Sequence, residues 1–236
     1  MEQTLISCQG LSKNFDGVRA LDNVDLAVGT GRIIGLLGPN GSGKTTLIKI
    51  LCGLIQKTSG TITVDGHAPD TYTKSIISYL PDRMYFDDHA RAVDMLKLFS
   101  DFYSDFDYEK AESMCASLGI ALKQRIKAMS KGTKEKMQLV LVMSRKAKLY
   151  LLDEPIAGVD PAARDFILNT ILTNYNSEGT VIISTHLIAD IEQVLDEAIF
   201  LQNGHIVLHD TVDNIREREG KSVDALFREV FRAHAL

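Results

Sequence analysis

The stretch GPNGSGKTT, from Gly38 to Thr46, decides the fold of this 236-residue chain. It follows the apolar run IIGLL (residues 33–37) and precedes LIKILCGLI (residues 47–55), in which apolar residues recur at helical spacing. A buried strand, a glycine-rich loop and a helix in this order present backbone N–H groups and the positive end of a helix dipole to phosphate oxygens. The stretch fits the pattern GxxxxGK[ST] and therefore predicts a nucleotide phosphate site.

Two side chains of this stretch have specific expected roles. Lys44 would reach the β- and γ-phosphates of the nucleotide, and the hydroxyl of Thr45 would hold Mg²⁺. The alternative is a glycine-rich turn with a surface lysine at the start of an ordinary helix, which the flanking strand and helix disfavour. The residues expected to bind the nucleotide here are Gly38, Pro39, Asn40, Gly41, Ser42, Gly43, Lys44, Thr45 and Thr46.

A second motif is LYLLDEP, residues 149–155, in which an apolar strand ends in two adjacent carboxylates. Like charges repel each other and their desolvation is costly, so a buried strand has no internal reason to end in this way. A divalent cation removes the difficulty. We expect Asp153 to bind Mg²⁺ directly or through water, and Glu154 to polarise the attacking water. The alternative is a strand end that reaches solvent with two ordinary acids.

The remaining periodicities place these motifs within a larger fold. Short β-branched runs between residues 5 and 28 predict a small antiparallel sheet, and GTITVDG (residues 60–66) adds a strand and a turn. A helical pattern covers residues 93–141, and three apolar runs after it are typical of buried strands: LYLLD, TVIIS and EAIFL. The pattern predicts an α/β fold, with a P-loop NTPase core, an N-terminal antiparallel β subdomain and an inserted α-helical subdomain.

We expect a single domain over residues 1–236, divided into three parts. The nucleotide-binding core with its β subdomain is expected at residues 1–85 and 146–210. The helical subdomain is expected at residues 86–145, and a C-terminal helical segment at residues 211–236.

The C-terminal segment contains an amphipathic pattern. Its apolar residues recur at i, i+3, i+4, i+7 and i+8, which places them on one face of a helix, and Ser222 is expected as the N-cap. We expect this face to pack on its own domain, with contact to a second subunit as the alternative. The residues on the face are Val223, Leu226, Phe227, Val230 and Phe231.

Composition excludes several classes of protein. The chain is 45% hydrophobic with a formal net charge of −5, which is unlike a disordered chain or a protein with a basic surface for nucleic acid, so we expect no nucleic-acid partner. Cys8, Cys52 and Cys115 form no CxxC pair and are expected to be free thiols in a reducing compartment. The chain starts without signal-peptide features and lacks an apolar run approaching about 20 residues, so any membrane role is expected to be peripheral.

In their order and intervals, these motifs resemble the nucleotide-binding domain of ABC transporters over nearly the whole chain. The resemblance implies that Phe15, in LSKNF, stacks on adenine; an apolar strand residue facing the core is the alternative. It implies that His186, which follows TVIIS, hydrogen-bonds the γ-phosphate; a capped turn residue is the alternative. Asp160, in IAGVDP, is expected to reach across a dimer.

Two motifs depart from the family pattern. Asp82, in ISYLPD, stands where the family usually has a glutamine that senses Mg²⁺ and the γ-phosphate; an aspartate can accept from water or face the cation but cannot donate. MSKGT, residues 129–133, replaces LSGGQ but keeps Ser130 and Gly132. These two residues are implied to touch the γ-phosphate of ATP held by a partner subunit. A serine ahead of a helix is also an ordinary N-cap.

The resemblance implies an ATPase with catalytic residues Glu154, His186 and Lys44, with ATP and Mg²⁺ as its ligands. ATP is expected to join two subunits head to tail, in a homodimer or in a heterodimer with a related ATPase subunit. The expected partners are transmembrane permease subunits, and the expected location is cytoplasmic and peripheral, on the inner face of the cell membrane. The YLPD and SKG variants and the short C-terminus favour export; the alternative is an ABC ATPase that drives a membrane complex mechanically without moving a substrate.

A docking surface for the membrane partner is expected at Arg83-Met-Tyr-Phe86, directly after Asp82. Three large apolar side chains in a row follow neither helical nor strand periodicity, so some of them should be exposed. Met, Tyr and Phe suit a partner helix that lies in a groove. The alternative is that all three fill the core.

Overall fold

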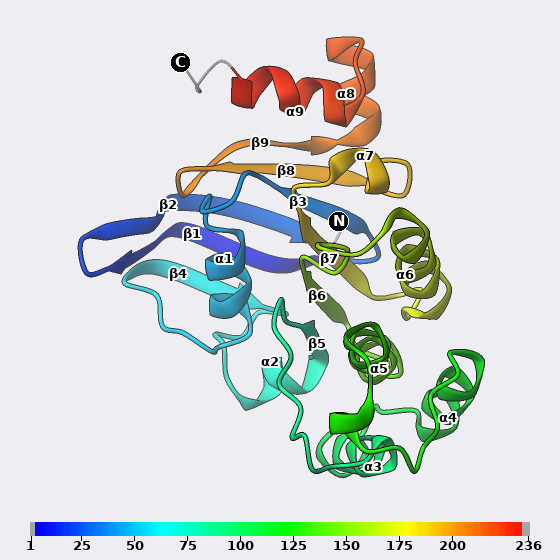
Figure 1. Cartoon of the computed structure of the whole chain (residues 1–236). Helices are drawn as coiled ribbons and strands as arrows, with labels where there is room; N and C mark the ends of the chain where they lie inside the picture. The colour runs from blue at the N-terminus through cyan, green and yellow to red at the C-terminus, as the bar shows by residue number, and fades with distance from the viewer. Residues whose placement is uncertain (1–2, 233–236) are drawn as a thin grey trace.

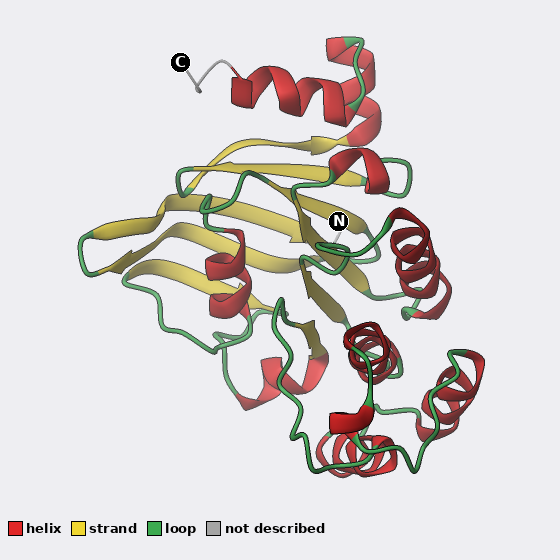
Figure 2. Ribbon diagram, viewed as in Figure 1, coloured by secondary structure: helices red, strands yellow, loops and turns green. Residues whose placement is uncertain are grey.

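Residues 3–232 are described by a computed structural model with two β-sheets, in which a hairpin of the smaller sheet projects at one side and most helices lie around the larger sheet (Figures 1 and 2). The smaller sheet consists of β1 (Thr4–Phe15), β2 (Val18–Gly29) and β4 (Ser59–Val64), with β1 in the middle and both neighbours antiparallel to it. At the tip of the β1–β2 hairpin, Asp16 and Gly17 have φ angles of 43° and 92°. Two residues with positive φ match the twist of a tight hairpin, so the predicted antiparallel sheet is confirmed.

The larger sheet has six strands in the order β5-β6-β7-β3-β8-β9. Adjacent strands are parallel from β5 to β8, and β9 is antiparallel at the edge. The four buried strands expected from apolar runs are present, but β5 and β9 were not predicted because one is very short and the other alternates in exposure. The bounds are β3 (Ile33–Leu37), β5 (Ile77–Leu80), β6 (Leu149–Asp153), β7 (Thr180–Thr185), β8 (Glu197–Gln202) and β9 (His205–Thr211).

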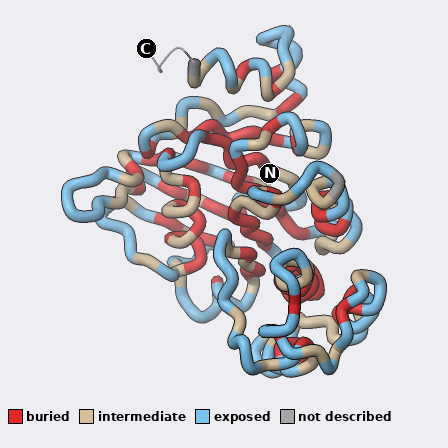
Figure 3. Tube along the Cα trace, in the orientation of Figure 1, coloured by how far each residue is buried: buried red, intermediate tan, exposed pale blue. Residues whose placement is uncertain are grey.

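The core lies on both faces of this larger sheet. One hydrophobic cluster joins the sheet to the β1–β2–β4 sheet and to α1 (Lys44–Leu51), and the other joins it to the later helices. Figure 3 shows the central strands buried, as expected for a parallel sheet covered on both sides, whose strands are continuous apolar runs. The three cysteines are free and buried, and burial raises the pKa of the Cys8 and Cys52 thiols to about 12.

The predicted helical block gathers at one end of the molecule (Figure 1). It consists of α3 (Ala92–Phe102), α4 (Tyr108–Ser117), the 3-10 turn η1 (Ile126–Ala128) and α5 (Lys131–Met143). The other helices are α2 (Thr71–Ile76), α6 (Pro161–Asn174) and α7 (Ile188–Ile191). None of the helices in residues 3–232 combines the length and the apolar character needed to cross a membrane.

A buried arginine fastens the helical block to the larger sheet. Arg145 is 2% exposed, and its guanidinium donates to both carboxylate oxygens of Asp105, at 2.9 and 3.0 Å. It also donates to the carbonyls of Ser75 and Ile77, at the end of α2 and the start of β5, and lies 3.7 Å from the centre of the Tyr103 ring. Four donated hydrogen bonds and a stacked ring account for the burial of this charge.

The C-terminal segment forms α8 (Val212–Glu219) and α9 (Val223–Arg232), which lie beyond β9 (Figure 1). The rings of Phe227 and Phe231 lie 5.4 and 6.0 Å from that of Phe200 in β8. The hydroxyl of Ser222 accepts from the N–H of Ala225 at 3.2 Å. The predictions that this face packs on its own domain and that Ser222 caps the helix are confirmed. The expected segment extends to residue 236, and its last four residues lie outside those described.

Candidate nucleotide site

The glycine-rich loop is shaped by contacts that leave no room for side chains at two of its glycines. A Cβ on Gly38 would lie 2.3 Å from the carbonyl oxygen of Leu201, and one on Gly43 would lie 2.4 Å from that of Ala20. Gly43 also has a φ of 111°, a conformation that glycine adopts without strain. The loop is therefore pressed between β2 and β8, and α1 begins directly after it at Lys44.

Lys44 points back into this loop and is only 5% exposed. Its Nζ donates to the carbonyl of Gly38 at 2.7 Å and to that of Pro39 at 3.2 Å, and lies 3.4 Å from Oε1 of Glu154. Helix α1 has no acidic residue in its first turn and no side-chain cap, so its first N–H groups face the loop without a side-chain acceptor. A buried cation and the end of a helix thus converge on one place, which suits a phosphate chain.

Asp153, at the end of β6, has one satisfied and one unsatisfied carboxylate oxygen. Its Oδ1 accepts from the hydroxyls of Ser184 at 2.6 Å and Thr45 at 3.2 Å, whereas its buried Oδ2 has no hydrogen-bond partner among the described residues. Burial raises the pKa of Asp153; the two hydroxyl donors lower it, and the charges of Asp82 and Glu154 raise it further. A divalent cation would satisfy Oδ2 and offset this charge, so Thr45 and Asp153 fit Mg²⁺.

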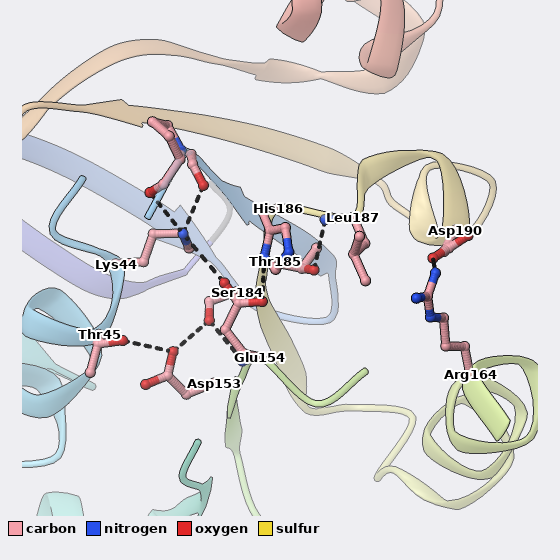
Figure 4. A network of polar contacts seen from close by, with 12 residues as sticks. Lys44, Thr45, Asp153, Glu154, Arg164, Ser184, Thr185, His186, Leu187 and Asp190 are labelled. Atoms are coloured by element: carbon pink, nitrogen blue, oxygen red, sulfur yellow. Dashed lines mark hydrogen bonds and ion pairs between the residues drawn. The ribbon is translucent and has the colours of Figure 1, made fainter. Parts of the chain in front are cut away.

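Glu154 is held in an unusual backbone conformation beside Lys44 (Figure 4). Its φ is 52°, in the left-handed region, and its N–H lies 3.1 Å from the carbonyl and 3.0 Å from the hydroxyl of Ser184. Its Oε2 atom lies 3.1 Å from Nδ1 of His186, and its Oε1 atom lies 3.4 Å from Nζ of Lys44. Strained, fully bonded residues of this kind cluster at functional sites. The structure therefore brings the three predicted catalytic residues together.

Asp82 lies apart from these direct contacts. Its side chain is 36% exposed, and its recorded partner is the guanidinium of Arg83 at 3.9 Å. Its charge contributes to the raised pKa of Asp153. Its role as a ligand stays a prediction.

Phe15 lies at the end of β1 and is 42% exposed, so the alternative that it faces the core is wrong. Ala20 and Leu21, on the neighbouring strand, contact Gly43 in the phosphate loop. The hairpin that carries this exposed aromatic ring is therefore in contact with the loop through its second strand, and the base of a nucleotide could stack on the ring.

Ser130 and Gly132 lie at the start of α5, where they are exposed. The Ser130 hydroxyl accepts from the N–H of Thr133 at 3.1 Å and lies 2.8 Å from its hydroxyl, so Ser130 is the N-cap of α5. A Cβ added to Gly132 would have nothing within 4 Å. Asp160 is likewise exposed, as the N-cap of α6. Within the described residues, none of these three is hydrogen-bonded to residues 38–46.

Comparison with known proteins assigns the family. The sequence profile of the family described as "ABC transporter" matches residues 21–157. The ABC transporter ATP-binding protein YdbJ of Bacillus subtilis is 32% identical over 212 residues, covering 87% of this chain and 69% of YdbJ. The lantibiotic transport ATP-binding protein SrtF of Streptococcus pyogenes is 29% identical over 218 residues, covering 90% of this chain and 95% of SrtF.

A solved structure agrees with these relatives. The ATP-binding subunit of an ABC transporter superposes with a TM-score of 0.86 and 27% identity, covering 96% of this chain and 99% of the other. The P-loop NTPase fold with an antiparallel β subdomain and a helical block is thereby confirmed. With its phosphate loop, its buried lysine and its paired carboxylates, this chain belongs to the ABC transporter family, as an ATP-binding protein whose ATPase activity is coupled to transport.

Proposed function

We propose that this chain hydrolyses ATP at the interface of a head-to-tail dimer and so drives export through separate transmembrane permease subunits. The main support is the contact of Glu154 with both Lys44 and His186 beside the phosphate loop. The dimer would contain a second copy of the chain or a related ATPase subunit. Its location would be cytoplasmic, on the inner face of the cell membrane.

The chemical roles follow from where the side chains lie. Lys44 would bind the β- and γ-phosphates in exchange for its contact with Glu154. Freed from Lys44, the Glu154 carboxylate would accept a hydrogen bond from the attacking water and orient it. His186, which lies 3.1 Å from the Glu154 carboxylate, would hydrogen-bond the γ-phosphate. Mg²⁺, held by Thr45 and Asp153, would neutralise charge that develops on the phosphate oxygens.

Asp82 and Phe15 complete this half of the site. We propose that Asp82 accepts hydrogen bonds from water around the cation, since its exposed carboxylate can accept but not donate. Phe15 would stack on adenine. The remaining loop residues would bind phosphate through their backbone N–H groups.

The second half of each site would come from the partner subunit. A hydroxyl has one donor and two acceptor positions, so Ser130 can cap α5 and still donate its own proton to a γ-phosphate. Glycine is a poorer helix former than alanine, and no neighbour among residues 3–232 requires a glycine at position 132. Close approach of another molecule would explain that glycine. Asp160 is exposed and would reach the same interface.

Sedimentation of a Glu154→Gln variant tests the dimer. This variant should bind ATP without hydrolysing it and sediment as a dimer with saturating ATP and Mg²⁺, but as a monomer or loose dimer without nucleotide. A second substitution, Ser130→Ala, should abolish the ATP-dependent dimer. A Glu154→Gln chain that stays monomeric with saturating ATP would contradict a dimer of this chain with itself, and the heterodimer would then be tested by adding a related ATPase subunit.

The membrane partner is proposed to dock in an apolar groove of about 660 Å³ between the helical block and the larger sheet. Met84 and Tyr85 are exposed on its wall, whereas Phe86 packs against the hydrophobic core. Of the three residues expected to dock, two are thus available to a partner helix. Apolar side chains that line the groove include Leu54, Met84, Tyr85, Leu98, Phe99 and Phe102.

Transport of a substrate is favoured over purely mechanical work by the similarity to SrtF, whose name assigns it to lantibiotic transport. Export as the direction is proposed from the YLPD and SKG variants. We also propose a role for each part of the chain. Residues 1–85 and 146–210 bind the nucleotide, residues 86–145 couple it to the membrane partner, and residues 211–236 support the larger sheet. Inside-out membrane vesicles that carry the chain with its membrane subunits would distinguish the two functions. Export predicts that ATP causes a substrate to accumulate inside the vesicles, whereas purely mechanical work predicts no accumulation.

A further inference from the structure

The aromatic ring proposed to stack on adenine is in contact with a lysine. Lys13 Nζ lies 4.5 Å from the centroid of the Phe15 ring. The two residues are two apart on β1, and the strand pairing is irregular between Lys13 and Asn14, so the contact is given by the distance itself and not by regular strand alternation. Within residues 3–232, no carboxylate forms an ion pair with this ammonium, so the ring is its recorded partner.

The Phe15 ring lies next to the turn of a hairpin whose second strand contacts the phosphate loop. The hairpin turn after Phe15 is fixed by two consecutive residues with positive φ, and the next strand touches Gly43. Phe15 itself is 42% exposed, so packing alone leaves its side chain free to change rotamer. A cation over one face of such a ring is attracted by its quadrupole and holds the ring in one orientation.

We propose that Lys13 is a positioning residue for the base: its ammonium covers one face of Phe15 and holds the ring so that a purine stacks on the other face. This inference rests on the proposed adenine contact of Phe15. Orienting the ring before the nucleotide arrives reduces the ordering that binding would otherwise require. Because Lys13 acts on the base, it affects the affinity for ATP and leaves the hydrolytic step unchanged.

The inference predicts a loss that depends on the ring. Lys13→Met keeps most of the apolar stem but removes the charge, and it should weaken ATP binding to the purified full-length chain by about two- to fivefold, the range expected for an exposed cation–ring contact. The KM for ATP should rise by the same factor, with kcat unchanged. Lys13→Arg keeps a cation over the ring and should retain the original affinity.

Three controls separate this role from a general effect of charge. Arg19 lies on the same hairpin, and its guanidinium lies 2.8 Å from the carboxylate of Asp22. Arg19→Met removes this cation and should leave the affinity for ATP unchanged. Inorganic tripolyphosphate has the phosphates but no base, so its own dissociation constant, obtained by competition after correction for the affinity of a fluorescent ATP analogue, should be equal for Lys13→Met and the original chain. In a Phe15→Leu background, Lys13→Met should have no further effect on ATP binding.

The outcomes distinguish two failures. If Phe15→Leu leaves ATP affinity unchanged, the proposed contact of Phe15 with adenine is wrong and the role of Lys13 is wrong with it. The role of Lys13 is overturned, while that of Phe15 stands, if Phe15→Leu weakens ATP binding but Lys13→Met leaves it unchanged or strengthens it. The same holds if Lys13→Met weakens the binding of tripolyphosphate as much as the binding of ATP.

Discussion

The carboxylate of Glu154 lies 3.4 Å from the ammonium of Lys44, although the two residues belong to different motifs far apart in the chain. The same carboxylate lies 3.1 Å from His186, so one acidic side chain holds two basic groups beside the phosphate loop. Glu154 therefore joins Lys44, which is expected to bind the nucleotide, to His186, which is expected to act in the chemical step.

His186→Ala should reduce kcat far more than it changes nucleotide binding. Removing one group that stabilises developing charge costs about 100- to 1,000-fold in rate, and we expect a loss near that range with a KM within a few-fold. Steady-state ATPase kinetics provide the measurement. His205→Ala is the matched control, since the carboxylate beside His205 is that of Asp22, at 3.6 Å, and not that of Glu154. An equal loss in both variants would show that His186 has no special role.

Asp153→Asn should raise the melting temperature in the absence of Mg²⁺ while abolishing ATPase activity. Burial raises the pKa of Asp153 in the folded protein above its value in the unfolded chain, so the folded state binds the carboxyl proton more tightly. The stability of the protein therefore falls as the pH rises from the unfolded pKa through the folded pKa. At neutral pH the buried charge is therefore a net cost, which the neutral amide removes.

Thermal unfolding at pH 7 in EDTA and in Mg²⁺ with ATP would test the Asp153 prediction. The original chain should gain stability with Mg²⁺ and ATP, and Asp153→Asn should gain much less. A variant that melts lower than the original chain in EDTA would contradict the idea that this carboxylate is destabilising without a cation.

Tyr85→Ser and Phe86→Ser should separate docking from folding. Phe86 packs against the core, and its loss should lower the free energy of unfolding by about 2–4 kcal/mol. Tyr85 is 47% exposed, so Tyr85→Ser should fold and bind ATP normally while it loses the co-expressed membrane subunit on purification. Val207→Ser, on exposed β9, should affect neither property. Severe destabilisation by Tyr85→Ser would assign that residue to the core.

Arg145→Met should lower the free energy of unfolding by about 2–4 kcal/mol, because it leaves Asp105, the buried carbonyl of Ile77 and the partly buried carbonyl of Ser75 without their donor. Arg145→Lys should recover only part of this loss, since an ammonium cannot reproduce the guanidinium fork. Urea unfolding gives the values. Arg218→Met breaks an exposed ion pair with Asp210 and should cost less than about 1 kcal/mol. Equal losses in the two methionine variants would contradict a special role for the buried arginine.

The sequence predicts the parts of the site whose geometry is local. GPNGSGKTT determines its own loop because the strand, the glycines and the helix are consecutive, and LYLLDEP predicts buried carboxylates from a single strand. The left-handed backbone of Glu154 and its contact with Lys44 have no local signal, because they arise only when β6 and β3 enter the same sheet.

Other features depend on packing between distant segments. Arg145 occurs in MSRKAK, where flanking lysines give the appearance of a solvated basic stretch, and its carboxylate partner lies on the loop before α4. Phe86 and Tyr85 are adjacent and chemically alike, yet one is packed and the other exposed. Strand β9 alternates in exposure at a sheet edge, which weakens the hydrophobic signal that identified β3 and β6.

The position of β3 within the larger sheet determines when this protein can acquire its ligand during synthesis. Both hydrogen-bonded neighbours of β3 come from the last third of the chain, and the N–H of Gly204 donates to the carbonyl of Ser42 at 2.9 Å. The glycine-rich loop is made early, but the walls against which it folds leave the ribosome late. A chain that ends before β8 should therefore fail to retain ATP, and a chain that extends through Gly204 should bind it.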